Sequence, residues 1–409
     1  MARASTTEYL LHELIALPSV NPAFLPPDNP RTGEGRVAEF LKKAAFRAGL
    51  ETDLQNVLPE RSNLIVRLSP TAKPRQRILL APHLDTVGAS DNQFTPRQKN
   101  GRIFGRGACD TKGSVAAMFS ALCEMALKGP RPRQTEIVFA GLVDEENAQT
   151  GSRTLAARGP KADLAIVGEA TRLQVVTAHK GSLWLRLETR GKSAHGAHPE
   201  LGRNAIRMMA QVVEILEGDY AEKLRQRTHP LLGHATVNVG SINGGVQANI
   251  VPDSCAILLD RRTLPGETEA GVVREIGAFL RTGLNHSLRT SSSSSSSSSK
   301  PIAKRATRNS SANEELNFTI TGGKDAPCLP LETDPTLPLV KQFLANAAQH
   351  RPVGVHYFCD ASVLAHGGIP SIVFGPGDIA QAHTADEWIS VSQLNRAQAL
   401  LLRFLRSLP

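Results

Sequence analysis

Residues 77–85 read Arg-Ile-Leu-Leu-Ala-Pro-His-Leu-Asp, a run of apolar residues that ends in a histidine and an aspartate. A short apolar run of this kind is typical of a buried strand in a parallel sheet. In open α/β sheets, functional side chains gather beyond the carboxyl ends of the strands. The run therefore predicts a central strand that delivers His83 and Asp85 to a site at one edge of a sheet.

Three further apolar runs are followed by acidic or histidine side chains. Glu145 and Glu146 follow Ile-Val-Phe-Ala-Gly-Leu-Val-Asp, Glu169 follows Leu-Ala-Ile-Val-Gly, and His383 comes after Ser-Ile-Val-Phe. Asp110 lies on a glycine-rich turn, Gly-Arg-Gly-Ala-Cys-Asp, before a predicted helix. A lone His-x-Asp or Glu-Glu pair is common by chance. The joint order of these elements favours one shared site.

These residue types are the ligands that zinc prefers. Zinc binds histidine nitrogen and carboxylate oxygen, and a catalytic zinc leaves one position open for water. Two cations held close together need a shared carboxylate to offset their repulsion, and Asp110 is predicted as this bridge. His83 and Glu169 are predicted to complete one metal site. Glu146 and His383 are predicted to complete the other.

The remaining acids near these ligands predict a proton carrier and a positioning group. Asp85 lies two residues from His83, so both side chains share one face of the strand end, and Asp85 can hold the imidazole tautomer. Adjacent residues that leave a strand point apart, so Glu146 can bind metal while Glu145 faces the open position. Glu145 is then the predicted general base, which takes a proton from water and carries it to the leaving amine.

The composition is that of an ordinary globular protein. At 409 residues the chain is too long for one core and predicts two domains. The net charge is +9, but aromatic residues make up only 4% and basic residues are dispersed, which argues against a nucleic-acid partner. No apolar stretch is long enough to cross a bilayer, so no membrane association is expected.

The five cysteines form no Cys-x-x-Cys pair and predict reduced, mostly buried thiols of a cytoplasmic protein. The N-terminus shows no signal-peptide pattern. Cys109, beside Asp110, could be a ligand or a nucleophile. A small buried side chain under the site is the favoured interpretation.

The pattern of predicted elements divides the chain. Residues 1–178 alternate strands and helices, the α/β signature. Residues 179–322 follow the order β-α-β-β-α-β of a ferredoxin-like motif, with its last strand predicted at 316–320. Residues 323–409 return to helices and a strand at 371–374. The sequence therefore predicts a catalytic α/β domain, made of 1–178 and 323–409, into which a second domain is inserted.

A low-complexity segment lies within the inserted domain. The unbroken run Ser291–Ser299 is followed by a basic stretch, and this composition cannot bury enough apolar area to offset chain entropy. A disordered loop at about 287–314 is predicted. A regulatory basic tail is the less favoured alternative.

Other catalytic signatures are missing from the sequence. No Gly-x-Ser-x-Gly elbow of a serine hydrolase occurs. Gly191-Lys-Ser resembles the end of a phosphate-binding loop, but arginine occupies the upstream glycine position at 186. No dinucleotide-binding Gly-x-Gly-x-x-Gly occurs either.

Three strings, His83-Leu-Asp-Thr-Val, Gly105-Arg-Gly-Ala-Cys-Asp-Thr-Lys-Gly and Asp144-Glu-Glu, resemble those of a known metallohydrolase family. It is the acetylornithine deacetylase / succinyl-diaminopimelate desuccinylase family, whose superfamily includes aminoacylases and glutamate carboxypeptidases. The segment Val167–Gly181 is most similar to the deacetylase and desuccinylase branch. The resemblance covers essentially the whole chain except the serine-rich segment. It implies a dizinc aminopeptidase-like domain with two Zn²⁺ per chain (Co²⁺ may substitute), a ferredoxin-like dimerisation lid and a homodimer.

The same resemblance gives roles to polar residues of the lid. His195 in Gly191-Lys-Ser-Ala-His matches a histidine that reaches the scissile carbonyl, often across the dimer, which implies oxyanion stabilisation. Asn249 and Arg262 match positions linked to binding of the substrate carboxylate, and a planar guanidinium suits a carboxylate. A turn salt bridge is an equally favoured role for Arg262. His198 is expected to be a surface residue.

The chain departs from the family at two places. Ala170 stands where the family often has proline, next to the predicted ligand Glu169. Residues 357–362 read Tyr-Phe-Cys-Asp-Ala-Ser where family members commonly show Gly-Gly-Thr-Asp. That region helps to line the pocket for the acyl group or side chain, so the identity of the substrate stays open.

The sequence thus predicts a cytoplasmic dizinc amidohydrolase that removes the acyl group from an N-acyl amino acid. Acetylornithine and succinyl-diaminopimelate types of substrate are the leading candidates. A peptidase of the same family, acting on a dipeptide or a C-terminal glutamate, is the alternative enzyme. A non-catalytic binding protein is the third possibility, and the intact Glu145 argues against it.

Overall fold

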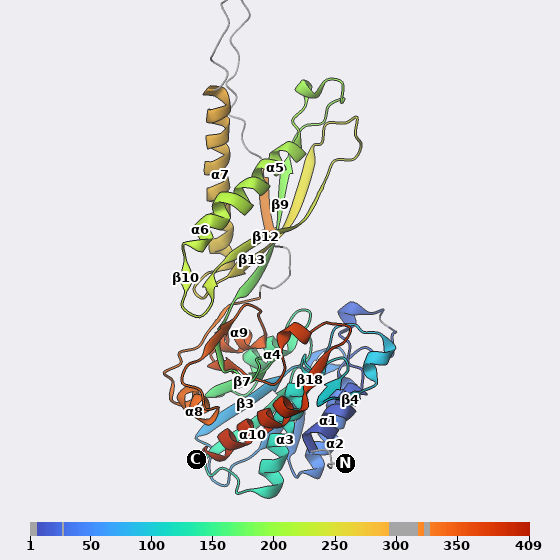
Figure 1. Ribbon diagram of the computed structural model, residues 1–409, viewed down its shortest axis with the longest axis vertical. Helices are drawn as coiled ribbons and strands as arrows, with labels where there is room; N and C mark the ends of the chain where they lie inside the picture. The colour runs from blue at the N-terminus through green and yellow to red at the C-terminus, as the bar shows by residue number, and fades with distance from the viewer. Residues whose placement is uncertain (1–5, 27, 294–317, 323–327) are drawn as a thin grey trace, which may run out of the picture. The chain divides into compact units, whose positions relative to one another are not determined.

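The computed structural model describes residues 6–26, 28–293, 318–322 and 328–409 (Figure 1). The chain divides into two compact units. The sheet unit comprises Met1–His179 and Leu331–Pro409, and the inserted unit comprises Lys180–Pro330. The inserted unit extends past the predicted end at 322, because Ser182 forms a β-bridge with Cys328.

The sheet unit is built on a nine-stranded sheet in the order β1-β2-β6-β3-β7-β17-β8-β15, with β16 paired to β8. Its four middle strands, β6, β3, β7 and β17, are parallel, and antiparallel strands flank them on both sides. This mixed sheet with a parallel centre confirms the predicted fold class. The strands are β1 (Glu51–Leu58), β2 (Arg61–Leu68), β3 (Gln76–Pro82), β6 (Thr135–Gly141), β7 (Leu164–Gly168), β8 (Val176–His179), β15 (Leu331–Glu332), β16 (Val353–Val355) and β17 (Ser371–Val373).

Strand β3 lies at the centre because it is apolar on both sides. Successive side chains of a strand point to opposite faces of the sheet. Leu80 packs into the core on one face with Phe139 and Ile166, while Leu79 belongs to a second core on the other face. Leu79 and Leu80 are both fully buried. A continuous apolar run is therefore needed here, as the sequence pattern indicated.

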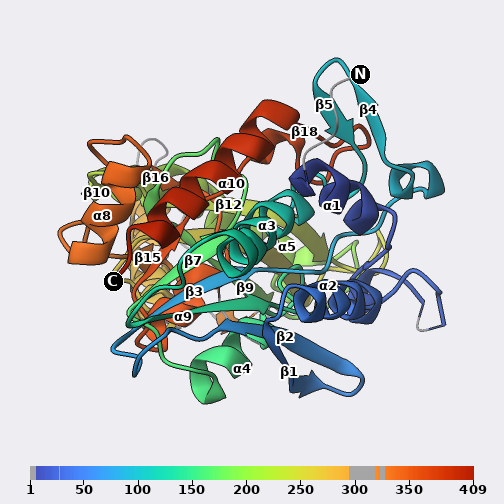
Figure 2. The ribbon, with the colours of Figure 1, turned by 90° about the horizontal axis from the view of Figure 1, so that it is seen from below.

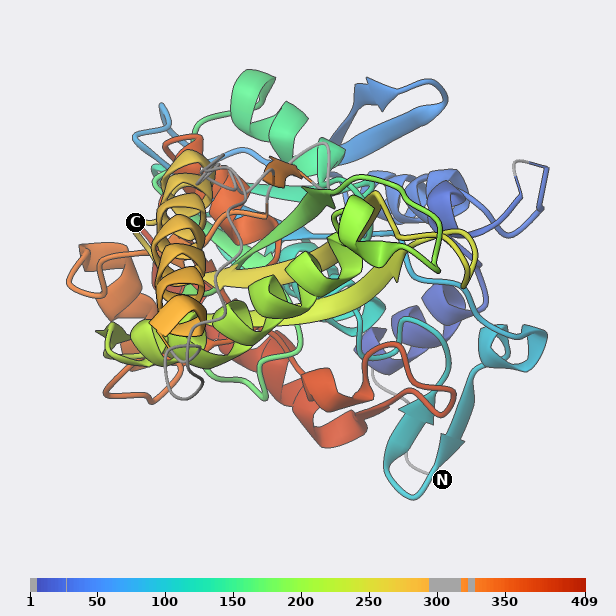
Figure 3. The same cartoon turned by 90° about the horizontal axis from the view of Figure 1, so that it is seen from above.

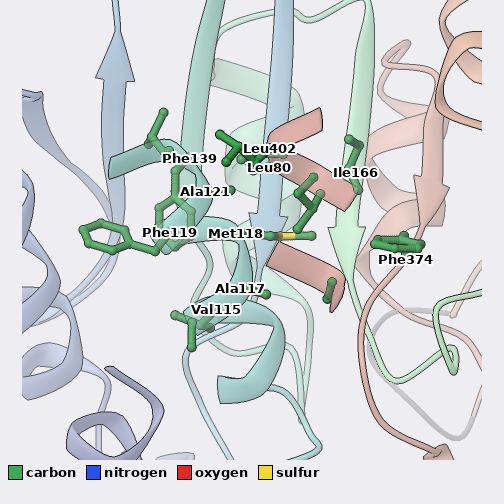
Figure 4. Packing of buried hydrophobic residues seen from close by; sticks show 14 of the residues in the cluster. Leu80, Val115, Ala117, Met118, Phe119, Ala121, Phe139, Ile166, Phe374 and Leu402 are labelled. Atoms are coloured by element: carbon green, nitrogen blue, oxygen red, sulfur yellow. The ribbon is translucent and has the colours of Figure 1, made fainter. Parts of the chain in front are cut away.

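Helices cover both faces of the sheet, with α1, α3 and α10 on one side of β3 and β7 and α4 and α9 on the other (Figure 2). Met118 and Phe119 of α3 pack onto the strands, and the ring of Phe119 meets that of Phe139 edge-on at 5.4 Å (Figure 4). The helices of this unit are α1 (Thr6–Ile15), α2 (Gly35–Arg47), α3 (Lys112–Lys128), α4 (Thr150–Arg158), α8 (Pro338–Asn346), α9 (Asp360–His366) and α10 (Val391–Arg406).

A small three-stranded sheet joins two distant parts of the sheet unit. Its order is β18-β5-β4, formed by Trp388–Ser390, Arg102–Phe104 and Arg97–Lys99. The pairing of β18 with β5 brings the segment after His383 beside the turn that contains Asp110.

The inserted unit contains a four-stranded antiparallel sheet in the order β12-β13-β9-β14. Helix α5 packs on one face of this sheet and α7 packs beside α5; they are green and gold in Figure 3. Along the chain the main elements follow the predicted order β-α-β-β-α-β. The unit consists of β9 (Gly181–Arg190), α5 (Ala205–Ile215), α6 (Ala221–Arg225), β10 (Thr228–His229), β11 (Gly233–His234), β12 (Thr236–Gly244), β13 (Ser254–Thr263), α7 (Glu269–Ser293) and β14 (Phe318–Gly322).

Burial alternates along β9. Leu183, Leu185 and Leu187 are buried, while Trp184 is half exposed. Helix α7 runs to Ser293 and so enters the segment predicted as a loop at about 287–314. The remainder of that segment, 294–314, lies outside the described residues. Within the described part of the chain, no helix has both the length and the apolar character needed to span a membrane.

Candidate active site

Three strand ends supply most of the predicted ligands. His83 directly follows β3, Glu169 directly follows β7, and Glu145 and Glu146 come shortly after β6. Strands β6, β3 and β7 are parallel neighbours, so their carboxyl ends meet at one edge of the sheet. The pairing continues past the strands, since His83 forms a parallel bridge with Leu142. The side chains are therefore brought together as the sequence predicted.

Two loops complete the cluster. Asp110 lies at the end of the glycine-rich turn that leads into α3, and His383 lies between β17 and β18. His383 has a φ of 61°, in the left-handed region that residues other than glycine rarely adopt. Such backbone strain costs on the order of 1 kcal/mol and concentrates at functional sites.

The carboxylate of Asp110 lies between two imidazoles. Its Oδ1 is 3.1 Å from Nε2 of His83, and its Oδ2 is 3.2 Å from Nε2 of His383. Nε2 of His383 is also 3.2 Å from Oε2 of Glu146, and Nε2 of His83 is 3.7 Å from Oε1 of Glu169. His83 and His383 thus approach opposite oxygens of Asp110, with Glu169 beside His83 and Glu146 beside His383.

The donor atoms of this cluster suit metal ions. Donor atoms of His83, Asp110 and Glu146 all lie within 4.8 Å of one another. Burial and the charge of Asp110 raise the pKa of Glu146 to about 7. Burial also raises the pKa of Glu169 well above its usual value. Oε1 of Glu146 is buried and has no hydrogen-bond partner among the described residues. Divalent cations would neutralise these like charges.

Asp85 contacts more groups of the site than the sequence indicated. Nδ1 of His83 lies 3.4 Å from the carboxylate of Asp85 and 3.1 Å from its backbone carbonyl. The same carboxylate accepts the backbone N–H groups of Glu145 (3.2 Å) and Glu146 (3.1 Å). Burial opposes its charge, but contacts with His83 and Asn21 keep the pKa of Asp85 below its usual value. Asp85 therefore orients both an imidazole and the Glu145–Glu146 backbone.

Glu145, the predicted general base, is partly buried beside this cluster. Burial raises the pKa of its carboxyl well above the usual range, and the charges of Asp360 and Glu169 act in the same direction. Asp360 is itself buried and accepts a hydrogen bond from Ser152 (2.5 Å). These acids make the surroundings of Glu145 strongly negative.

Asn21, which was not predicted from the sequence, is fully buried. Its Nδ2 donates to Oδ2 of Asp85 (2.8 Å) and to Oδ1 of Asp144 (3.0 Å). The carboxylate of Asp144 also accepts a hydrogen bond from Nη1 of Arg61 (3.2 Å). Arg61 is in turn paired with Glu34 (Nε to Oε2, 3.0 Å). One amide thus separates two carboxylates behind the site. The Asn-Pro dipeptide at 21–22 indicates only a turn, so local sequence gave no signal of this role.

The structure also places Cys109 and Glu387 near Asp110. Cys109 is fully buried, its thiol donates to the carbonyl of Asp378 (3.2 Å), and burial raises the pKa of the thiol. This confirms the favoured interpretation of Cys109 as a small buried side chain. Glu387, not predicted from the sequence, accepts the backbone N–H of Asp110 (3.0 Å).

The three predicted lid residues occupy two places in the inserted unit. The loops of His195 and Asn249 are adjacent, since His195 bridges Ile250 and the N–H of Gly196 donates to the carbonyl of Asn249 (2.7 Å). Arg262 lies towards the opposite end of β13 and pairs with Asp260 (Nε to Oδ2, 2.8 Å). The structure therefore does not bring Arg262 to the other two residues within this unit. His198 is exposed, as expected.

Most of the chain matches a known protein family. Residues 79–407 match the model of Peptidase family M20/M25/M40. The chain belongs to this family. As a member it is a metal-dependent hydrolase that acts on carbon–nitrogen amide bonds. The family assignment also confirms the resemblance inferred from the motifs.

Individual relatives include both deacetylases and peptidases. The chain is 30% identical over 370 residues to an acetylornithine deacetylase of Myxococcus xanthus, covering 89% of this chain and 88% of the relative. It is 29% identical to the same enzyme of Proteus mirabilis (strain HI4320), covering 96% and 94%. Among solved structures, the aminopeptidase PepT from Bacillus cereus has a TM-score of 0.74 at 21% identity (98% and 97% covered). An M20 family metallo-carboxypeptidase from Sulfolobus solfataricus has 0.68 at 18% (98% and 99% covered). At these identities, the structures support the fold alone.

We expect Asn21→Ala to destabilise the sheet unit by about 1–3 kcal/mol, because two buried carboxylates lose the donor that they share. Asn21→Asp should cost more, since it adds a third charge between Asp85 and Asp144. Urea unfolding of the purified protein measures the change. Asn56→Ala, at an exposed position of β1, is the matched control. An equal midpoint for the Asn21→Ala and Asn56→Ala variants would contradict the role assigned to Asn21.

Proposed function

We propose that this protein is a two-cation deacylase that removes the acyl group from an N-acyl amino acid. The observation that carries the proposal is the position of Asp110, with one carboxylate oxygen towards His83 and the other towards His383. A carboxylate in this position can bridge two cations and offset their repulsion. Enzymes that bind two metals a few ångströms apart use this arrangement for hydrolysis.

The residues of the site fit two zinc ions. His83, Asp110 and Glu169 would hold one cation. Asp110, Glu146 and His383 would hold the other. Zinc accepts this mixture of imidazole and carboxylate donors, and Co²⁺ can replace it in similar sites. When bound, such cations polarise the substrate carbonyl and make water more acidic.

Glu145 is proposed as the group that moves the proton. Its neighbour Glu146 contacts His383, while the backbone N–H groups of both glutamates are held by Asp85. Glu145 is thus fixed beside the donors without contributing to either set. It would take a proton from the attacking water and deliver it to the nitrogen of the leaving amine. A base kept beside a complete set of donors argues against a non-catalytic binding protein.

The relatives favour deacylation over peptide hydrolysis. The relatives named acetylornithine deacetylase match at 29–30% identity over 89–97% of this chain. The aminopeptidase and carboxypeptidase structures share the fold at 18–21% identity. A family peptidase remains the second candidate, because residues 357–362 depart from the motif that lines the pocket. The five cysteines are all free and four are buried, which supports the proposed cytoplasmic location.

The substrate proposal is tested by a panel of amides assayed with added Zn²⁺ or Co²⁺. We expect kcat/KM for N-acetylornithine, or for an N-succinyl amino acid such as succinyl-diaminopimelate, to exceed that for dipeptides and tripeptides by roughly tenfold or more. A pocket that fits one acyl group discriminates by about this factor. Higher kcat/KM for a peptide than for every acylated amino acid would favour the peptidase instead.

The metal and proton roles are separated by two substitutions. Asp110→Ala should lose zinc from both sites, because both donor sets share this carboxylate. Glu145→Gln should keep the zinc content of the wild type and lose turnover by a factor on the order of 10²–10⁴, since it removes only the proton carrier. Elemental analysis and kcat are the two measurements. Unchanged zinc in Asp110→Ala or near-normal kcat in Glu145→Gln would refute the corresponding assignment.

We further propose a homodimer formed through the inserted unit. Strand β12 lies at the edge of its sheet, and its Ile242 side chain is 57% exposed. An edge strand with free backbone groups can pair with a second copy. Beyond this strand, the loop that contains Val246, which is 95% exposed, lines a cavity of about 540 Å³. Burial of these side chains would stabilise such a dimer.

His195 is proposed to act on the substrate of the partner chain. Its Nδ1 accepts the N–H of Ala197 (3.1 Å), so the ring proton lies on Nε2, where it can stabilise an oxyanion. The junction with the sheet unit is at Lys180, at the start of β9, and His195 follows the end of that strand. Ten residues of β9 span about 33 Å. The resemblance to the family, in which the matching histidine often acts across the dimer, supports this assignment.

His195→Ala should keep its zinc and its dimer but lose kcat by a factor on the order of 10²–10³, the usual cost of one oxyanion donor. Mixing His195→Ala with inactive Glu145→Gln subunits tests the partner. In a mixed dimer one site lacks both groups and the other has both intact, so activity should partly return. Absence of recovery in dimers verified as mixed would mean that His195 serves its own chain or has no role in catalysis.

A further inference from the structure

Glu387 is a buried carboxylate that belongs to neither of the two proposed donor sets. It lies four residues after His383 and directly before β18, and it is 1% exposed. Its side chain points into the turn that ends at Asp110. Its backbone carbonyl accepts the N–H of Gly105 (3.0 Å), at the other end of the same turn.

Both oxygens of Glu387 accept hydrogen bonds from this turn. Oε1 accepts the backbone N–H groups of Cys109 (2.8 Å) and Asp110 (3.0 Å). Oε2 accepts the N–H of Gly107 (3.0 Å) and Nη1 of Arg106 (2.7 Å). Three backbone donors and one guanidinium therefore converge on a single carboxylate.

The backbone of the turn depends on this convergence. Gly107 has a φ of 82°, and a Cβ at this position would lie 2.9 Å from Cδ of Lys112 and 3.1 Å from Cγ2 of Thr86. Successive N–H groups that face inward form an anion-binding concavity. Here the anion is a side chain of the same protein. Without it, several buried N–H groups would lose their partner, at a cost that favours another conformation of the turn.

The segment that carries His383 is fixed to the same turn. The carbonyl of Thr384 accepts Nη2 of Arg106 (3.3 Å) and Nε2 of Gln93 (3.1 Å). At the other end of the segment, Trp388 pairs with Phe104 in the small sheet. Glu387 and Arg106 thus connect the backbone next to Asp110 with the backbone next to His383, 273 positions further along the sequence.

We infer that Glu387 is a positioning residue that fixes the distance between Asp110 and His383. The inference rests on the proposed two-cation site. Because Asp110 belongs to both donor sets, a shift of its turn alters both sets at once. Glu387 therefore contributes to the affinity for both cations, although its carboxylate belongs to neither set of donors.

The experiment titrates metal-free protein with Zn²⁺ in competition with a chromophoric chelator. Glu387→Ala should weaken the binding of both equivalents by about 10–100-fold, the usual effect of removing a group that orients metal ligands. Glu387→Gln keeps an oxygen for Cys109 and Asp110 but turns an amide N–H₂ towards Gly107, so its loss should be intermediate. Asp386→Asn removes an exposed carboxylate one residue away and is the matched control, with unchanged affinity expected.

A second measurement separates positioning from a general loss of structure. The circular dichroism spectrum and Tm of the metal-free variants are compared with those of metal-free wild type, and kcat is measured as a function of free Zn²⁺. Positioning predicts a wild-type spectrum and recovery of most of kcat at high Zn²⁺. A folded Glu387→Ala that binds both equivalents with wild-type affinity would overturn the inference. If that variant does not fold, Glu387→Gln decides by the same criterion.

Failure of the underlying proposal gives a different result. If wild-type protein itself binds fewer than two equivalents of Zn²⁺, Co²⁺ or Mn²⁺, the two-cation function fails. If the wild type binds two equivalents and the Glu387 variants bind both with the same affinity, the two-cation function stands. The positioning role of Glu387 is then wrong.

Discussion

The carboxylate of Asp110 contacts two imidazoles at once, and the catalytic unit is organised around this double contact. His83 reaches Asp110 from the end of β3, and His383 reaches it from a loop of the C-terminal part. Both contacts require that the sheet and the loop of His383 are held in place relative to the turn between β5 and α3. The buried acids nearby raise the cost of any misplacement, because like charges repel strongly where water is excluded.

That constraint explains why so many buried polar groups surround the site. Asp85 accepts two backbone N–H groups and one from Asn21, and Glu387 accepts three backbone N–H groups together with Arg106. Each carboxylate is paired with donors that belong to segments distant in sequence. Hydrogen bonding of this kind makes a buried charge tolerable and selects one conformation of the loops. The donors are therefore held in place by the hydrogen bonds of Asp85 and Glu387 together.

The strands and the donors at their ends could be predicted because both signals are local. An apolar run followed by His83, Glu169 or the Glu145–Glu146 pair contains the strand and its functional residue within twelve positions or fewer. Asn21 and Glu387 escaped prediction for the opposite reason. Asn21 meets Asp85 across 64 positions and Glu387 meets Asp110 across 277, and neither follows an apolar run. The flanking strand β1 was missed because its residues are mostly exposed and lack a buried face.

The acidic side chains of the site also favour the binding of cations. The fold brings Asp110, Glu146 and Glu169 together, and burial raises the pKa of Glu146 to about 7. Ligands that bind only the folded state stabilise it, by an amount that grows with their concentration relative to Kd. In this protein, cation binding would offset a repulsion that the fold itself creates. The hydrogen bonds that Asp85 and Glu387 accept from the backbone of Glu145, Glu146 and Asp110 hold the donors in the positions that such cations require.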